Sequence, residues 1–274
     1  MKQHVRVPWP LRVLCVVVGL WLVAPTFVVI PLSFTGEQSF NFPPESWSLT
    51  YYKQFFTDPA WTDALLVSVQ LAVWVTLLAT VLGTAAAFAL VRGRIRVAVA
   101  AQGLLLLPMI IPQIVVAIAI YIAFLEWGLQ GTMIGLVVAH TALAIPFVVI
   151  TVSASIRTLD RRIEHAAASL GASPITVLRL IIAPLIVPGV LSGAVFAFVT
   201  SFDEVVISLY LQSPDLRPLP VQMFTSVTYN IDPTMAAASS IIVTATTLLL
   251  LLPQMIGRRK KRTRTEEQPA AVSA

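Results

Sequence analysis

The sequence predicts an all-α protein that crosses a membrane six times, and three observations support this fold class. Of the 274 residues, 57% are hydrophobic and only 11% are charged, whereas about a quarter of the residues in a soluble domain are charged. The mean hydropathy is +0.87. Six apolar segments reach the length of about 20 residues that a membrane-spanning helix needs, and none alternates as a barrel strand does.

The predicted spans follow one another along residues 1–260, which are expected to form a single transmembrane domain. They are Leu11–Phe34, Ala64–Val91, Val97–Phe124, Met133–Ile156, Leu185–Leu211 and Met235–Ile256. The first follows Lys2 and Arg6, as the apolar part of a signal peptide would. Its length and the five later spans favour a retained helix instead. Residues 261–274 are predicted to be a polar, disordered cytoplasmic tail.

Lysine and arginine residues predict how the chain is oriented. Sixteen of the 18 fall in four segments, Lys2–Arg12, Arg92–Arg96, Arg157–Arg179 and Arg258–Arg264. The positive-inside rule therefore puts both termini and the 157–179 loop in the cytoplasm. This distribution also explains the pI of 9.7, because the basic residues flank spans and form no surface for nucleic acid. The longest outer loop, Thr35–Asp63, contains aromatic residues that predict a short interfacial segment.

The residue types argue against catalysis and metal binding within this chain. A single cysteine, Cys15, excludes an internal disulfide and a cysteine-rich metal site. The three histidines form no zinc-binding pair, and no lysine follows a glycine as in a phosphate-binding loop. An intramembrane enzyme or a membrane scaffold is therefore less favoured than a transport protein. ATP-driven transport would require a separate ATPase.

The most informative segment is the cytoplasmic loop 157–184, which predicts two short helices separated by a glycine. Asp160 is a favoured N-cap residue, and the first helix is expected over Ile163–Leu170. Gly171 suits the left-handed conformation that ends helices. Ser173–Pro174 is typical of a helix start, with serine as N-cap and proline as first helical residue. By itself the pattern fits either a docking element or an ordinary connector.

This loop resembles the cytoplasmic EAA loop of the binding-protein-dependent ABC importer permeases. The family pattern is Glu-Ala-Ala, three residues, Gly, nine residues, then Ile-x-Leu-Pro. The matching residues are His165, Ala166, Ala167, Gly171, Ile181 and Pro184, with every interval kept. His165 replaces the family's glutamate and Ala183 its leucine, while Glu164 retains a carboxylate next to the first of these positions. The resemblance implies a coupling helix that docks on a separate ATPase.

The resemblance covers nearly the whole chain and is closest to the spermidine/putrescine branch of the family. Leu104–Pro112, Ala139–Phe147 and Ser201–Glu204 carry it, with Gln113 where small residues are usual. It implies a type I ABC importer permease fold in the bacterial inner membrane. The implied partners are a second homologous permease, two ATPase subunits, a periplasmic or lipid-anchored substrate-binding protein and membrane lipid. ATP and magnesium would be bound by the ATPase, so no cofactor is expected in this chain.

Two adjacent carboxylates, Asp203 and Glu204, lie deep in the fifth predicted span. An ionisable group at depth costs about 2.5–3.5 kcal/mol on insertion scales, so it normally faces a cavity or a partner. At about 1.5 Å per residue, Asp203 lies in the outer third of the span. The pair is predicted to attract a cationic substrate, with polyamines as the first choice. Ferric ion, thiamine and cationic amino-acid derivatives are the alternatives.

Six residues of this span are predicted to line the substrate pathway. They are Ser201, Phe202, Asp203, Glu204, Ser208 and Tyr210. The Ser201–Glu204 segment also fits an S-x-x-E capping box, which would restart a helix broken within the membrane. An ion pair with a partner subunit is a further alternative. His140 is predicted to be a hydrogen-bonded packing residue. Pro108, Pro112 and Pro146 are predicted to kink their helices.

Overall fold

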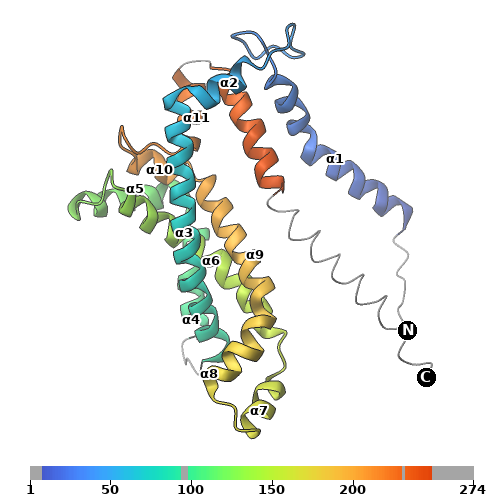
Figure 1. Cartoon of the computed structure of the whole chain (residues 1–274), viewed down its shortest axis with the longest axis vertical. Coiled ribbons are helices and arrows are strands. Elements are labelled where there is room, and N and C mark those ends of the chain that lie inside the picture. The colour runs from blue at the N-terminus through green and yellow to red at the C-terminus, as the bar shows by residue number, and fades with distance from the viewer. Residues whose placement is uncertain (1–7, 94–97, 230–231, 249–274) are drawn as a thin grey trace. The chain divides into compact units, whose positions relative to one another are not determined.

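A computed structural model describes residues 8–93, 98–229 and 232–248 of the chain (Figure 1). The elements are α1 (Trp9–Leu32), α2 (Thr50–Thr57), α3 (Pro59–Arg92), α4 (Ala98–Leu106), η1 (Leu107–Met109), α5 (Gln113–Glu126), α6 (Met133–Arg157), α7 (Arg161–Ser169), α8 (Pro174–Val177), η2 (Leu178–Ile182), α9 (Ala183–Phe202), α10 (Val206–Leu211) and α11 (Leu219–Tyr229). A further apolar helix covers Thr234–Leu248. In these ranges β structure is limited to two isolated bridges, so the all-α prediction is confirmed.

The described helices agree with a polytopic membrane protein. Four are long and apolar enough to span a bilayer: α1, α3, α6 and the run Pro174–Phe202, which joins α8, η2 and α9. A fifth span is formed if the bent pair Val99–Met109 and Gln113–Glu126 is counted as one. The predicted span Met235–Ile256 is described as far as Leu248. Its remainder and the predicted tail 261–274 lie outside the described residues.

The third predicted span, Val97–Phe124, is not one continuous helix. The first half ends at Met109, and α5 begins at Gln113 after a bend of 95°. Pro112 explains the break, because it has no N–H to donate and disfavours helical geometry in the residue before it. The prediction of a simple kink at Pro112 is therefore wrong. By contrast, α6 continues through Pro146.

The fifth predicted span, Leu185–Leu211, is also interrupted. The helical run starts earlier, at Pro174, and α9 ends at Phe202. The short helix α10 then begins at Val206. The two acidic residues of this span therefore lie in a break between helices, and the prediction of an unbroken fifth span is wrong. The alternative of a helix restarted within the membrane agrees with this break, but the S-x-x-E capping box does not form, because Ser201 lies inside α9 and its hydroxyl pairs with His140.

The chain divides into two compact units, of which the first comprises Met1–Thr62 and Thr225–Ala274. Its outer loop is organised by Glu37, whose carboxylate accepts hydrogen bonds from the backbone N–H groups of Glu45 (3.1 Å) and Ser46 (3.0 Å). The helix α2 lies within the segment Thr35–Asp63, for which aromatic residues predict an interfacial position.

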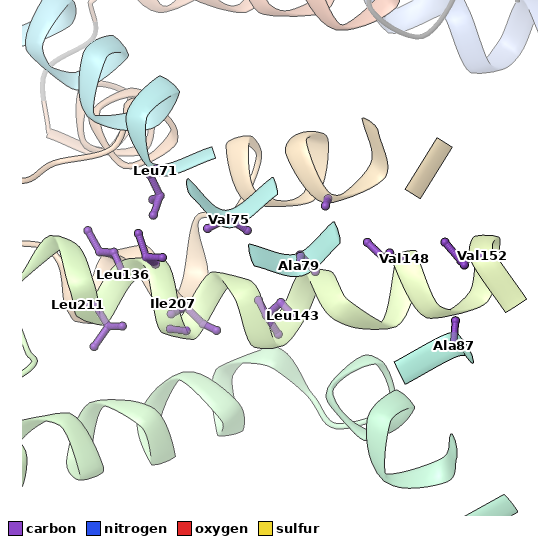
Figure 2. Packing of buried hydrophobic residues seen from close by; sticks show 14 of the residues in the cluster. Leu71, Val75, Ala79, Ala87, Leu136, Leu143, Val148, Val152, Ile207 and Leu211 are labelled. Atoms are coloured by element: carbon purple, nitrogen blue, oxygen red, sulfur yellow. The ribbon is translucent and has the colours of Figure 1, made fainter. Parts of the chain in front are cut away.

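The second unit, Asp63–Phe224, has α6 at its centre (Figure 2). The figure shows Leu71, Val75, Ala79 and Ala87 of α3 beside Leu136, Leu143, Val148 and Val152 of α6. On α9, a Cβ added at Gly193 would lie 2.7 Å from Thr151 Oγ1 of α6. A Cβ at Gly189, one turn earlier, would collide with the Ser155 hydroxyl. These glycines let the α6 and α9 backbones approach closely, as small residues do in membrane helix pairs.

Candidate functional site

Two helix breaks face each other in the second unit. One separates η1 from α5 and the other separates α9 from α10, and α5 lies beside α10 (Figure 1). The rings of Tyr121 on α5 and Tyr210 on α10 have centroids 6.0 Å apart. Within a membrane, a helix can be interrupted only where other groups satisfy the exposed backbone N–H and C=O groups. The breaks must therefore carry their own hydrogen-bond partners.

Glu204 supplies those partners at the second break. Its Oε1 accepts hydrogen bonds from the backbone N–H of Ile207 at 2.9 Å and from the Nε2 of Gln113 at 2.8 Å. Its Oε2 accepts from the backbone N–H of Ser208 at 3.0 Å. The first N–H groups of α10 have no partner inside that helix, so the carboxylate caps α10. The Gln113 bond also ties this break to the first one.

His140 extends the cluster onto α6. Its Nδ1 lies 3.2 Å from the hydroxyl of Ser201, and its Nε2 lies 3.1 Å from the hydroxyl of Ser208. The Oε2 of Glu204 is 3.5 Å from the same Nε2. The imidazole is 1% exposed and the carboxylate 2%. His140 is thus a hydrogen-bonded packing residue, as the sequence predicts, and it joins α6, α9 and α10.

The six predicted pathway residues have different surroundings. Ser201, Glu204 and Ser208 are buried in the cluster with His140. Phe202 is buried, and its ring stacks on Phe198 with centroids 5.7 Å apart. Tyr210 is half-buried. None of these contacts tests whether the residues meet a substrate, so the pathway remains a prediction.

Asp203 differs from its neighbour Glu204. It is exposed and lies at the C-cap of α9, in the break itself. In the part of the chain that the structure describes, its carboxylate has no hydrogen-bond or ion-pair partner. Two adjacent carboxylates therefore have separate roles available: one caps a helix, and the other is free to meet a ligand or another subunit.

Gln113 is the one cluster residue to which the sequence assigns no role. The only signal was that a polar residue stands where the resembled family usually has a small one. Its partner, Glu204, lies 91 residues further along the chain. Because Pro112 puts Gln113 at the start of α5, the amide is available to cross-link the two breaks.

The loop 157–184 has the predicted helix caps and the predicted glycine turn. The Asp160 carboxylate caps α7 by accepting from the backbone N–H of Arg162 at 2.9 Å. Gly171 has a φ of +85° and ends the first helix in the left-handed region. The Ser173 hydroxyl accepts from the Thr176 N–H at 3.2 Å, and Pro174 is the first residue of α8. The first helix covers Arg161–Ser169, so it begins two residues earlier than predicted.

The coupling-loop residues differ in exposure. His165, Ala166, Gly171 and Pro184 are exposed, whereas Glu164, Ala167 and Ile181 are partly buried. Ile181 lies in η2, a π-helical turn that the sequence pattern does not predict. Pro184 offers a reason for this turn, because its ring would clash with the carbonyl four residues before it in a regular helix. Exposed residues on α7 and α8 leave a surface on which another subunit can dock.

Comparison with known proteins identifies the family to which the chain is similar. Residues 79–262 match the model of the family described as binding-protein-dependent transport system inner membrane component. The chain is 32% identical over 221 residues to the spermidine/putrescine transport system permease protein PotC of Haemophilus influenzae, covering 81% of this chain and 86% of that protein. It is 30% identical over 241 residues to the putrescine transport system permease protein PotI of Escherichia coli, covering 85% of each.

A solved structure resembles the fold. It belongs to a bacterial ABC transporter involved in the import of the acidic polysaccharide alginate. The TM-score is 0.65, and the match covers 89% of this chain and 94% of that one. Only 14% of the aligned residues are identical, so this likeness supports the architecture alone.

Proposed function

Because the chain belongs to the family of inner membrane components of binding-protein-dependent transport systems, we propose that it is the permease of a polyamine importer. It is a multi-pass membrane component of a transporter and not an enzyme. The polyamine assignment is supported by relatives whose names specify spermidine and putrescine. In the chain itself, one observation carries it: the exposed carboxylate of Asp203 at the break in the fifth span.

A polyamine is a chain of ammonium groups joined by methylenes. It therefore needs carboxylates for its charges and apolar or aromatic surface for its stem, where cation–π contacts contribute about 0.5–2 kcal/mol each. In this proposal Asp203 provides the charge and the aromatic residues Phe202 and Tyr210 provide part of the surface. An anion would be repelled at the same depth. Ferric ion, thiamine or a cationic amino-acid derivative is the second candidate class.

The proposed complex contains four further subunits. This permease pairs with a second, homologous permease, and two ATPase subunits bind ATP and magnesium on the cytoplasmic side. A periplasmic or lipid-anchored protein delivers the substrate from outside. The segment α7–α8 docks on one ATPase. For transport to be driven, ATP and the loaded binding protein must each favour one of two conformations of the spans.

The proposed orientation has both termini in the cytoplasm and can be tested by thiol labelling. After Cys15→Ala, single cysteines at Ser46 and Ser213 should react with a membrane-impermeant reagent in intact cells. A cysteine at Ser169 should react only after permeabilisation, because the positive-inside rule puts α7 in the cytoplasm. Labelling of Ser169 in intact cells would reverse the orientation and remove the docking role of α7–α8.

The substrate assignment is tested by Asp203→Asn, which removes a charge and keeps the shape. If the carboxylate meets substrate, the variant complex should assemble at the normal yield, whereas loss of an ion pair with the partner permease would lower that yield. Its uptake of labelled spermidine or putrescine into proteoliposomes should fall by about tenfold or more, as expected when a hydrogen-bonded or paired charge is lost at a binding site. Molybdate, ferric ion and thiamine serve as comparison substrates. If the parent complex imports one of these and no polyamine, the polyamine assignment is wrong and the permease assignment stands.

A further inference from the structure

The cytoplasmic ends of three helices meet at Arg92, the last residue of α3. Its Nη2 lies 2.7 Å from the Oε1 of Glu164 on α7. The same nitrogen donates to the backbone oxygens of Ile156 at 3.4 Å and Leu159 at 3.3 Å, where α6 ends. The side chains of Arg92 and Glu164 are only 15% and 27% exposed. This ion pair is therefore better shielded than a surface pair, which contributes little.

The local backbone explains why these groups attract one another. The last carbonyls of α6 have no partner within that helix and form the negative end of its dipole, so they favour a cation. Glu164 stands in the first turn of α7, where the positive end of a helix dipole favours an anion. The Nη2 of Arg92 contacts both the Glu164 carboxylate and the backbone oxygens at the end of α6.

A second arginine ties the same helices in the opposite direction. Arg161, the first residue of α7, donates from its Nη2 to the backbone oxygen of Val91 at 3.2 Å. That oxygen lies at the end of α3. Two side chains therefore cross-link α3 and α7, and one of them also holds the end of α6. Apart from these polar contacts, α7 is held by the links Thr158–Asp160 and Leu170–Ser173 and by the packing of Ala167 against the hydrophobic core.

We propose that Arg92 is a positioning residue that makes α7 and the cytoplasmic ends of α3 and α6 move as one body. A displacement of α7 then reaches α3 and α6 directly. Glu164 has its role inside this permease, as the partner of Arg92, while the exposed His165 and Ala166 face outward. The proposal rests on the proposed function, in which α7–α8 docks on an ATPase, and it adds how the movement enters the spans.

The physical link is tested by distance measurements that need no substrate. In the assembled complex, after Cys15→Ala, spin labels are placed at the exposed residues Ala89 on α3 and Ser169 on α7. The parent should give a narrow distance distribution, and Arg92→Gln and Glu164→Gln should broaden it. Glu164→Gln keeps the arginine and its carbonyl contacts, so it covers the case in which Arg92→Gln does not fold. Arg162→Gln removes an equal charge from a side chain with no described polar contact, and it should leave the distribution narrow.

The second readout is the amount of substrate imported per ATP hydrolysed. Arg92→Gln should lower this ratio by about fivefold or more, the range of a typical coupling free energy, while the ATPase still co-purifies. Arg92→Lys should recover part of it, because lysine keeps the charge and loses the planar set of donors. If the spin-label distance distribution is broad in the parent, or stays narrow in both Gln variants, the proposed link between α3 and α7 is wrong. Broadening with an unchanged ratio overturns the positioning role. A parent that imports no polyamine refutes the proposed substrate, and the distance result still decides the link.

Discussion

Replacing Glu204 with alanine is expected to lower the yield of folded permease sharply and to abolish transport. The change removes the acceptor of the Ile207 and Ser208 N–H groups and of the Gln113 amide. Gln113 is exposed, whereas each of the two buried backbone donors left without a partner costs about 1–3 kcal/mol. The expected destabilisation is therefore about 2 kcal/mol or more. The measurements are the monodisperse yield of the complex on size exclusion and its thermal unfolding midpoint.

The neighbouring carboxylate is the matched control. Asp203→Ala removes the same charge one residue earlier from an exposed position, so it should preserve yield and unfolding midpoint. Glu204→Gln should give an intermediate result, because a single amide oxygen cannot replace two carboxylate oxygens. Its NH₂ group would also face a backbone or side-chain donor. Normal yield and stability of Glu204→Ala, matching those of Asp203→Ala, would contradict the capping role.

Replacing Gly171 with valine is expected to uncouple ATP hydrolysis from transport while the permease stays in the membrane. Gly171 has a φ of +85°, and a β-branched residue is a severe outlier there. The left-handed conformation costs an L-residue about 1–2 kcal/mol. A Cβ at this position would meet nothing within 4 Å, so the backbone alone opposes the change. To relieve it, α7 and α8 must shift relative to each other.

The measurements are co-purification of the ATPase and stimulation of ATP hydrolysis by the loaded binding protein, both of which should fall. Gly171→Asn is the control, since asparagine also adds a side chain of about the size of valine but tolerates the left-handed region. It should behave nearly as the parent does. His165→Glu, which restores the family residue at an exposed position, should also be tolerated. Wild-type transport by Gly171→Val at normal expression would mean that the loop is only a connector.

The helix caps and the glycine turn of the loop 157–184 could be predicted residue by residue. Asp160, Gly171 and Ser173 act on backbone groups within four residues of themselves, so the local sequence is enough to predict where the helices begin and end. The π-helical turn η2 was missed, although Pro184 lies just after it. Sequence spacing also could not tell that Glu164 pairs with Arg92, because the partner belongs to a helix that ends 72 residues earlier.

Hydropathy predicted where the apolar spans lie and in which order, because solvation by lipid acts on every residue and needs no partner. It did not predict the breaks before Gln113 and after Phe202. An interrupted helix and a continuous one have the same apolar composition. The broken form is stable only when its free N–H groups find acceptors, and that depends on neighbouring helices.

By itself, the sequence determined the membrane location, the helical class, the two capped helices of the loop 157–184 and the presence of an acidic pair in the fifth span. Tertiary structure decided that the two acidic side chains have different surroundings. Glu204 turns inward to Gln113 and His140, which lie 91 and 64 positions away in the chain, whereas Asp203 remains exposed. The reason is physical: a carboxylate buried away from water must be surrounded by donors. The start of α10 supplies two backbone N–H groups to Glu204, and the packing of α5 and α6 against the break adds Gln113 and His140.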